Sequence, residues 1–384
     1  MKAILVSSSF PQSAEDYGGR FIAQAATDLS QRGWQIRVLG PPGEWAPHGI
    51  ERLSYSSPGG LLDGTGAPDA LQSQPIGGWA SAAATTACAL ASGLRASRPD
   101  ELIIGHWLVP GGLVAVAMGK KTGAPVHLYA HGSDVGLLET LPLGRTLART
   151  LADGAQGITF VSEDLCQRFA ALVGRPTRAH YSVAAMGITQ AKADSTFMEG
   201  LKAQTDNRTV VTTLGRMVPI KGLRTLVDAM TDLDNLVWLA LGDGPERPEL
   251  MDLCAQREIT MISPGVVNEA QREACLAQSH IFAQPSIELG ARKEGTPVAI
   301  LEAMAAGVPC VASATGGITD LAHESELRLV EPGDINGLRC ALMGLRDNEE
   351  ERVRIAARHR AFASRYLWSE WGQVHEKHLR NSVI

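Results

Sequence analysis

Short runs of β-branched and apolar residues alternate with helix-like stretches along the whole chain, and this alternation constrains the fold more than any other feature. A succession of β-α units predicts a parallel sheet with helices on both faces. The pattern restarts after the middle, so we expect two sheets. The strands expected in the first half are 2–8, 35–39, 101–104, 126–129 and 157–161. Those expected in the second half are 208–213, 236–241, 260–262, 281–284 and 308–312.

The predicted fold class is therefore α/β, with two Rossmann-like domains. A polar, weakly periodic segment at 188–207 is interpreted as the linker between a domain at 1–187 and one at 208–365. A second irregular stretch, at 56–78, is rich in Gly, Pro, Ser and Gln. Loops of that length inside a domain are often functional.

Composition excludes several classes of protein. Lys and Arg number 35 against 41 Asp and Glu, a formal net charge of −6, which argues against nucleic acid as a partner. The six cysteines form no CxxC pair, so no metal site is predicted. No apolar run approaches the roughly 20 residues that span a bilayer, and no secretory signal is expected. We expect a cytoplasmic protein with at most weak peripheral contact at the inner face of the membrane.

The most informative stretch is EGTPVAILEAMAAGVP, at 294–309. Thr296 is expected to cap a helix that begins at Pro297, and a helix N-terminus attracts anions. Glu294 precedes this N-terminus and Glu302 follows it, so one carboxylate can meet a group before the anion and the other a group beyond it. A nucleotide-sugar has that layout of hydroxyls, diphosphate and ribose. The alternative is two surface glutamates beside a capped helix.

A second stretch, GRMVPIKG at 215–222, follows an expected strand. Arg216 and Lys221 lie at the carboxyl edge of the predicted sheet, where ligands of open α/β sheets bind and where the two cations can converge on a phosphate. The alternative is a solvated basic loop.

Two weaker signals lie in the first half. His131 begins the sequence HGSD after an expected strand, where it can donate to a sugar hydroxyl or stabilise departing charge. The alternative is a loop histidine capped by Asp134.

Gly18 and Gly19 permit close approach of the backbone to a ligand. The GxGxxG fingerprint of dinucleotide sites is absent, which counts against such a cofactor.

Taken together, these residues resemble the retaining glycosyltransferases of family 4, which have the GT-B fold. Glu294 and Glu302 match the family's Glu-x7-Glu motif. The resemblance extends over nearly the whole chain and is strongest in the second half, at 214–223, 239–250, 282–288, 294–313 and 316–321. The first half matches more loosely, at 18–19, 106–111, 131–134 and 160–163.

The resemblance implies a role for each matching residue in the second half. Arg216 and Lys221 would bind the donor diphosphate and stabilise charge on the leaving nucleotide. Glu302 would hold the ribose hydroxyls, and Glu294 the hydroxyls of the transferred sugar. The remaining donor contacts implied here are the backbone of Gly295, Thr296 and Pro297, and, near the base, Val266 or Val267.

In the first half, the resemblance implies that His131 touches the sugar and that the loop at Gly18 and Gly19 approaches the diphosphate. The acceptor is expected near His106. The last helix, 366–384, is expected to cross back onto the N-terminal domain, with the two domains facing a cleft.

The implied reaction needs no metal and no cofactor besides the donor, a UDP- or GDP-linked sugar. An acceptor hydroxyl attacks on the face from which the nucleotide leaves, so an α-glycoside forms with retention. The expected role is synthesis of a cell-surface polysaccharide or glycoconjugate, with a sugar, lipid-linked or small-molecule acceptor. The alternatives are a sugar phosphorylase or nucleotide-sugar epimerase on the same fold, and a non-catalytic nucleotide-sugar binding protein.

Overall fold

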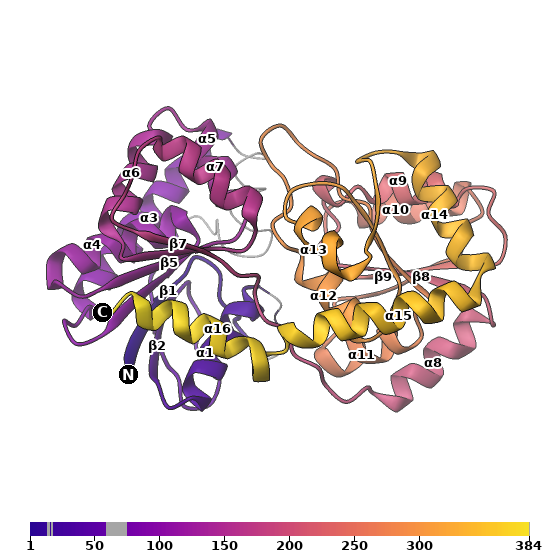
Figure 1. Ribbon diagram of the computed structural model, residues 1–384, viewed down its shortest axis with the longest axis horizontal. Coiled ribbons are helices and arrows are strands. Elements are labelled where there is room, and N and C mark those ends of the chain that lie inside the picture. The colour runs from indigo at the N-terminus through magenta and orange to yellow at the C-terminus, as the bar shows by residue number, and fades with distance from the viewer. Residues whose placement is uncertain (14–15, 17, 59–74, 384) are drawn as a thin grey trace. The chain divides into compact units, whose positions relative to one another are not determined.

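The computed structural model describes residues 1–13, 16, 18–58 and 75–383, with the side chains of 75–77 left aside. The chain forms two compact units (Figure 1). Unit 1 comprises Met1–Gly187 and Trp368–Ile384, and unit 2 comprises Ile188–Leu367. Each unit is a parallel sheet covered by helices, as the alternating pattern predicts.

Within the described residues, the sheet of unit 1 has seven parallel strands in the order β3-β2-β1-β4-β5-β6-β7. The strands are β1 Lys2–Val6, β2 Gln35–Gly40, β3 Glu51–Ser54, β4 Leu102–His106, β5 Val126–Ala130, β6 Gly157–Phe160 and β7 His180–Val183. β4 and β5 are buried along their full length, as strands with helices on both faces must be.

Figure 1 shows the helices of unit 1 on both faces of its sheet, with α3 to α7 on one face and α1 and α16 on the other. The helices are α1 Arg20–Gln31, α3 Pro75–Ala96, α4 Leu113–Thr122, α5 Ser133–Thr140, α6 Gly144–Gly154, α7 Glu163–Val173 and α16 Trp368–Asn381. A tight turn at Leu108–Gly112 joins β4 to α4.

The sheet of unit 2 has six parallel strands among the described residues, in the order β10-β9-β8-β11-β12-β13. They are β8 Thr209–Leu214, β9 Leu236–Leu241, β10 Met261–Gly265, β11 Ile281–Gln284, β12 Cys310–Ser313 and β13 Arg328–Val330. The helices are α8 Ser195–Thr205, α9 Leu223–Met230, α10 Arg247–Gln256, α11 Glu269–Ala277, α12 Val298–Ala305, α13 Ile318–Ser325, α14 Ile335–Asp347 and α15 Glu349–Ala363.

The core of unit 2 lies on both faces of its sheet. Side chains of α9, α10 and α14 pack on one face around Trp238, which is fully buried. Leu201 of α8 and Cys275 of α11 pack on the other face.

The expected strands are all present, and three further strands, β3, β7 and β13, were not predicted. β3 and β7 have four residues each and mix polar with apolar side chains, and β13 has only three residues, so none of them gives the long apolar run by which a buried strand is recognised. The predicted linker at 188–207 contains α8, which Asp194 caps by accepting from the N–H of Phe197. Most of the irregular stretch at 56–78 lies outside the described residues.

In the part of the chain that the structure describes, no helix combines the length and hydropathy that a bilayer-spanning segment requires.

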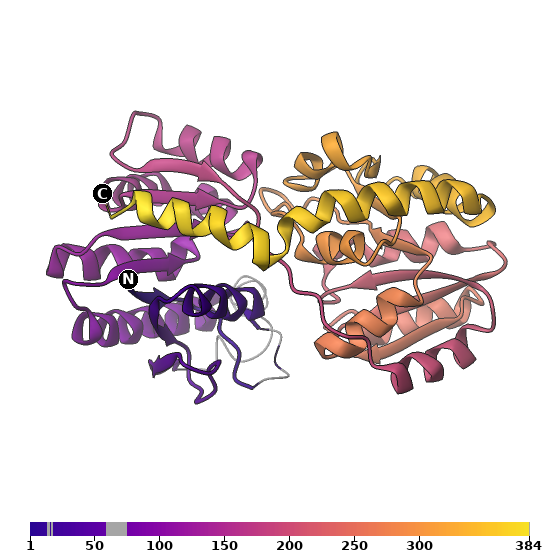
Figure 2. The ribbon, with the colours of Figure 1, turned by 60° about the horizontal axis from the view of Figure 1, so that its bottom comes forward.

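Helix α16 packs on unit 1, beside α1, in both views (Figures 1 and 2). Trp368, Gly372, His375 and Leu379 are buried along one face of the helix. The Arg32 guanidinium pairs with Asp28 and donates to the carbonyl of Trp368 at 3.1 Å. Gly372 lies so close to Asp28 and Arg32 that a Cβ atom would collide with both side chains.

The close approach at Gly372 gives a stability prediction. We expect Gly372→Ala to lower the melting temperature, because the added methyl displaces the Asp28–Arg32 pair on which α16 rests. Gly200→Ala is the matched control, since Gly200 lies in α8 with open space around it. There, alanine stabilises by about 0.5–1 kcal/mol. Differential scanning fluorimetry checks both, and a Gly372→Ala protein as stable as wild type would contradict the packing.

Candidate active site

Four loops interlock at the carboxyl edge of the unit 2 sheet, and two of them carry Arg216, Lys221 and Glu294. The loops follow β8, β9, β11 and β12, and parallel strands bring all such loops to one edge. Backbone hydrogen bonds join them in pairs: Met217 N to Asp243 O at 2.9 Å, Ile287 N to Ile220 O at 2.9 Å, and Gly317 N to Glu294 O at 3.2 Å. Glu294 and Lys221 therefore belong to one connected edge.

Gly316 has a structural reason to be glycine. Its φ is 49°, and a Cβ atom there would collide with the carbonyl oxygen of Glu294. The Gly316-Gly317 turn thus supports the backbone of the loop that presents the Glu294 carboxylate.

The Glu294 carboxylate is held by a cation and a hydroxyl. Lys221 Nζ lies 2.8 Å from Glu294 Oε1, and the Ser286 hydroxyl donates to the same oxygen at 3.0 Å. Gln284, at the end of β11, donates its side-chain N–H to Ser286 at 2.8 Å. Ser286 and Gln284 are buried, so the side chains that orient Glu294 are themselves fixed.

The Glu302 carboxylate, on α12, is held by a different cation. Arg272 of α11 donates to Glu302 Oε1 at 2.5 Å and to the carbonyl of Thr189 at 2.9 Å. It also pairs with Glu273 at 2.8 Å. The Arg272 side chain is only 1% exposed, and burial of a cation is tolerated where carboxylates pair with it. Glu294, which precedes α12, and Glu302, which lies within it, are thus each paired with a cation in the protein without a ligand.

The other predicted donor residues are placed as follows. Arg216 is exposed in the loop after β8. Val266 is 56% exposed and Val267 is 3% exposed, and the contact of their backbone with the base stays a prediction.

The predicted cap of α12 is wrong. The helix begins at Val298, and the N-cap is Pro297 in extended conformation, with no side-chain hydrogen bond at that position. Thr296 is therefore not the cap and Pro297 is not the first helical residue. Because proline has no side-chain oxygen, it cannot occupy a backbone N–H of the first turn, as a threonine cap would.

In unit 1, Asp134 holds the loop that carries His131. Its buried carboxylate accepts hydrogen bonds from the backbone N–H groups of His131, Gly132 and Val135, and from that of Leu108 after β4. Burial raises the pKa of Asp134 against the opposing effect of these bonds. Asp134 therefore caps the backbone of the loop and leaves the imidazole of His131 to other partners.

The imidazole of His131 meets a second histidine. His131 Nε2 lies 3.0 Å from His106 Nδ1, and the rings of Phe21 and Trp107 flank His131 with centroids 4.9 Å away. His106 is 2% exposed and stacks on Tyr129. In this position His106 contacts His131 instead of solvent, and its assignment to acceptor binding stays a prediction.

Gly19 precedes α1 with a φ of 71°, and a Cβ atom there would collide with the carbonyl of Ser9. The loop's own geometry thus requires glycine at Gly19. Gly18 differs, because its N–H donates to the Asp16 carboxylate at 2.8 Å and its added Cβ would meet only that side chain.

Sequence reasoning missed the residues that orient the site. Ser286 lies in the stretch 282–288 that carries the resemblance, but no role was predicted for it. Arg272 lies outside all such stretches, and its contact with Glu302 depends on how α11 packs within unit 2. Across the described residues, no group of three His, Cys, Asp or Glu side chains is arranged to hold a metal ion.

Both halves of the chain match models of glycosyltransferase families. Residues 18–182 match the "Glycosyl transferase 4-like domain", and residues 208–348 match "Glycosyl transferases group 1". Together these matches cover more than half of the chain. The chain thus belongs to the GT-B glycosyltransferases, with a family 4-like N-terminal domain.

The descriptions of two bacterial relatives name a donor and an acceptor. A GDP-mannose-dependent alpha-(1-6)-phosphatidylinositol monomannoside mannosyltransferase of Mycobacterium tuberculosis is 29% identical over 235 residues, 58% of this chain and 60% of the relative. A GDP-mannose-dependent monoacylated alpha-(1-6)-phosphatidylinositol monomannoside mannosyltransferase of Corynebacterium glutamicum is 27% identical over 75% of this chain and 76% of the relative. The first alignment thus spans less than two thirds of its relative's length.

Solved structures share the fold. Sucrose-phosphate synthase from Thermosynechococcus elongatus superimposes with a TM-score of 0.77 at 17% identity, over 99% of this chain and 98% of that one. Anabaena HepE in complex with UDP and glucose superimposes with a TM-score of 0.74 at 20% identity, over 99% of both chains. At these identities the likeness shows the fold alone, and it confirms the predicted GT-B class.

The buried histidines of unit 1 predict loss of stability in mild acid. Burial lowers the pKa of His127 and His131 to about 3 and that of His375 to about 4, and it lowers the pKa of His106 well below its usual value. The unfolded chain therefore binds more protons than the folded one below about pH 6.5, so stability is full above that pH and falls below it.

Each such histidine contributes up to about 1.4 kcal/mol per pH unit. Urea unfolding between pH 7 and 5 measures the slope, and His127→Gln should reduce it. A free energy of unfolding that does not change over this window would contradict the neutral, buried state of these rings.

Proposed function

We propose that this protein is a retaining glycosyltransferase that moves a sugar from a nucleoside-diphosphate donor to an acceptor hydroxyl, forming an α-glycoside. The observation that carries the proposal is the pair of oriented carboxylates on either side of the start of α12, Glu294 with Lys221 and Glu302 with Arg272. The match of both halves to glycosyltransferase families supports it.

In this proposal each group of the donor has a partner. Lys221 and Arg216 bind the diphosphate, together with the backbone at the start of α12, where the helix dipole favours negative charge. Glu302 accepts from the ribose hydroxyls, and Glu294 accepts from hydroxyls of the transferred sugar. The backbone of Val266 or Val267 borders the base, and His131 contacts the sugar.

The proposed reaction requires stabilisation of the leaving group and no covalent nucleophile. The acceptor oxygen forms a bond to the anomeric carbon while the bond from that carbon to the phosphate oxygen breaks. The acceptor proton passes to the departing phosphate oxygen on the same face. Lys221 and Arg216 stabilise the charge that grows on the diphosphate. Neither a metal ion nor a further cofactor takes part in the proposed reaction.

GDP-mannose is the donor we propose to test first. The relatives from M. tuberculosis and C. glutamicum are described as GDP-mannose-dependent mannosyltransferases. A further relative, from Bacillus subtilis, is described as a putative teichuronic acid biosynthesis glycosyltransferase, 27% identical over 63% of this chain. These descriptions support a carbohydrate acceptor that belongs to a cell-surface glycoconjugate.

Binding of nucleotides tests the donor site directly. A ligand at 100 times its dissociation constant adds about 2.7 kcal/mol of stability, so a thermal-shift panel of GDP, UDP, ADP and CMP should single out one nucleotide. Glu302→Ala should raise the dissociation constant of that nucleotide by about 10-fold or more, since hydrogen bonds to a charged group contribute about 1.5–3 kcal/mol.

Glu273→Ala is the matched control for this measurement, because Glu273 also pairs with Arg272 but does not lie on α12. It should bind the nucleotide as wild type does. Equal weakening in the two variants would assign the effect to Arg272 and refute ribose binding by Glu302.

The stereochemistry and the leaving-group role are tested by transfer itself. With an α-linked donor, the anomeric proton of the product should show an α-glycoside by NMR, and a β-linked product would refute retention.

Lys221→Ala should lower kcat by about 100-fold or more, as loss of a group that stabilises developing charge does. Lys202→Ala, on the exposed side of α8, is the control. Inorganic phosphate in place of the acceptor tests the phosphorylase alternative.

A further inference from the structure

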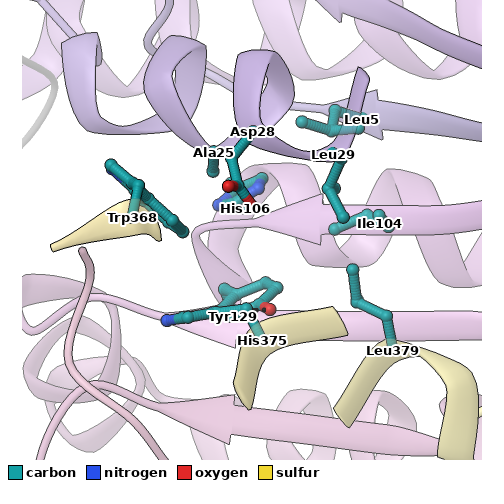
Figure 3. Close-up of a pocket in the computed structure, with 10 residues that line it drawn as sticks. All are labelled: Leu5, Ala25, Asp28, Leu29, Ile104, His106, Tyr129, Trp368, His375 and Leu379. Atoms are coloured by element: carbon teal, nitrogen blue, oxygen red, sulfur yellow. Dashed lines mark hydrogen bonds between the residues drawn. The ribbon is translucent and has the colours of Figure 1, made fainter. Parts of the chain in front are cut away.

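A small cavity lies inside unit 1, next to the histidine pair. Its volume is about 10 Å³, and its walls come from α1, α16 and the strands β1, β4 and β5 (Figure 3). A cavity of about this size holds one water when two to four polar groups face it. The polar side chains among its lining residues are Asp28, His106, Tyr129, Trp368 and His375.

Two of these polar groups, Tyr129 and His375, form a hydrogen bond with each other. His375 Nε2 lies 2.9 Å from the carbonyl oxygen of Ala185, which can only accept, so Nε2 carries the proton. His375 Nδ1 therefore accepts, and the Tyr129 hydroxyl donates to it at 3.0 Å.

Three groups remain, one each from α1, β4 and α16. The indole N–H of Trp368 is buried and has no hydrogen-bond partner among the described residues. Asp28 pairs with Arg32 through Oδ2, at 2.7 Å, and no described residue bonds to its Oδ1. His106 uses Nδ1 for His131, and the structure records no partner for its Nε2 within the described part of the chain. A buried donor left unpaired costs about 1–3 kcal/mol.

We propose that this cavity binds one water molecule, which accepts hydrogen bonds from Trp368 and from His106 Nε2–H and donates one to the Asp28 carboxylate. The proton of His106 therefore lies on Nε2, and Nδ1 accepts from His131 Nε2–H. His131 then presents an unprotonated Nδ1.

The proposed water makes Asp28, His106 and Trp368 positioning residues for His131. With Nδ1 unprotonated, His131 accepts a hydrogen bond from a hydroxyl instead of donating one. The tautomer of His131 depends only on residues of unit 1. Only the consequence of this tautomer for sugar transfer rests on the proposed function.

The test is the tautomer of His131 in the full-length protein, read by NMR of protein labelled with ¹⁵N-histidine. In wild type, His131 Nε2 should be protonated and Nδ1 should not. Trp368→Phe removes the indole N–H together with part of the ring, and Asp28→Asn replaces the carboxylate by a neutral amide of nearly the same shape. Both should convert the single tautomer of His131 into a mixture.

Two control variants perturb the same helix contact without touching the cavity. Trp34→Phe removes the bond from the Trp34 indole to Glu376 at 3.0 Å, and Glu376→Gln removes the charge that faces Arg32. Both should keep the wild-type tautomer. A change in the controls equal to that in the test variants would overturn the proposal by assigning the effect to the docking of α16.

A high-resolution crystal structure of the wild type gives the second readout. One water within hydrogen-bond distance of Trp368 Nε1, Asp28 and His106 supports the proposal. A dry cavity, or a protonated Nδ1 on wild-type His131, overturns it. These readouts need no transfer activity, so failure of the proposed function would appear separately, as loss of nucleotide binding with the His131 tautomer unchanged.

Discussion

A parallel sheet brings the carboxyl ends of all its strands to one edge, and the candidate active site depends on this constraint. In unit 2 it brings together four loops that are far apart in sequence, which then bond to one another through their backbones. Gly316 belongs to this edge because a side chain there would displace the backbone at Glu294. The loops therefore act as one rigid support for the functional side chains.

The second constraint is that a buried charge must be paired. Arg272 is almost completely buried, and Glu302 and Glu273 compensate its charge. Lys221 and Ser286 orient Glu294 in the same way. Such pairs hold the carboxylates in place before a ligand arrives, so little ordering cost remains for binding. In unit 1, the stacked neutral rings of His106, Tyr129 and His131 give a different kind of rigidity, without net charge.

The strands and the candidate motifs could be predicted because each leaves a local pattern: an apolar run, a strand followed by polar residues, or Glu294 and Glu302 at a fixed spacing. What could not be predicted depends on packing. β3 is too polar and β13 too short to be recognised, and the predicted cap at Thr296 is wrong because the chain stays extended through Pro297. Likewise, the contacts of Arg272 and the burial of His106 arise between elements distant in sequence.

The central claim is that the start of α12 and its two paired carboxylates bind a nucleoside-diphosphate sugar. The most direct measurement is a crystal structure of the protein with GDP-mannose or, if the thermal-shift panel selects uridine, with the UDP-linked sugar. The account predicts the diphosphate at Lys221 and the N-terminus of α12, the ribose hydroxyls at Glu302, and the sugar hydroxyls at Glu294. A nucleotide bound elsewhere, with the Lys221–Glu294 ion pair unchanged, would contradict it.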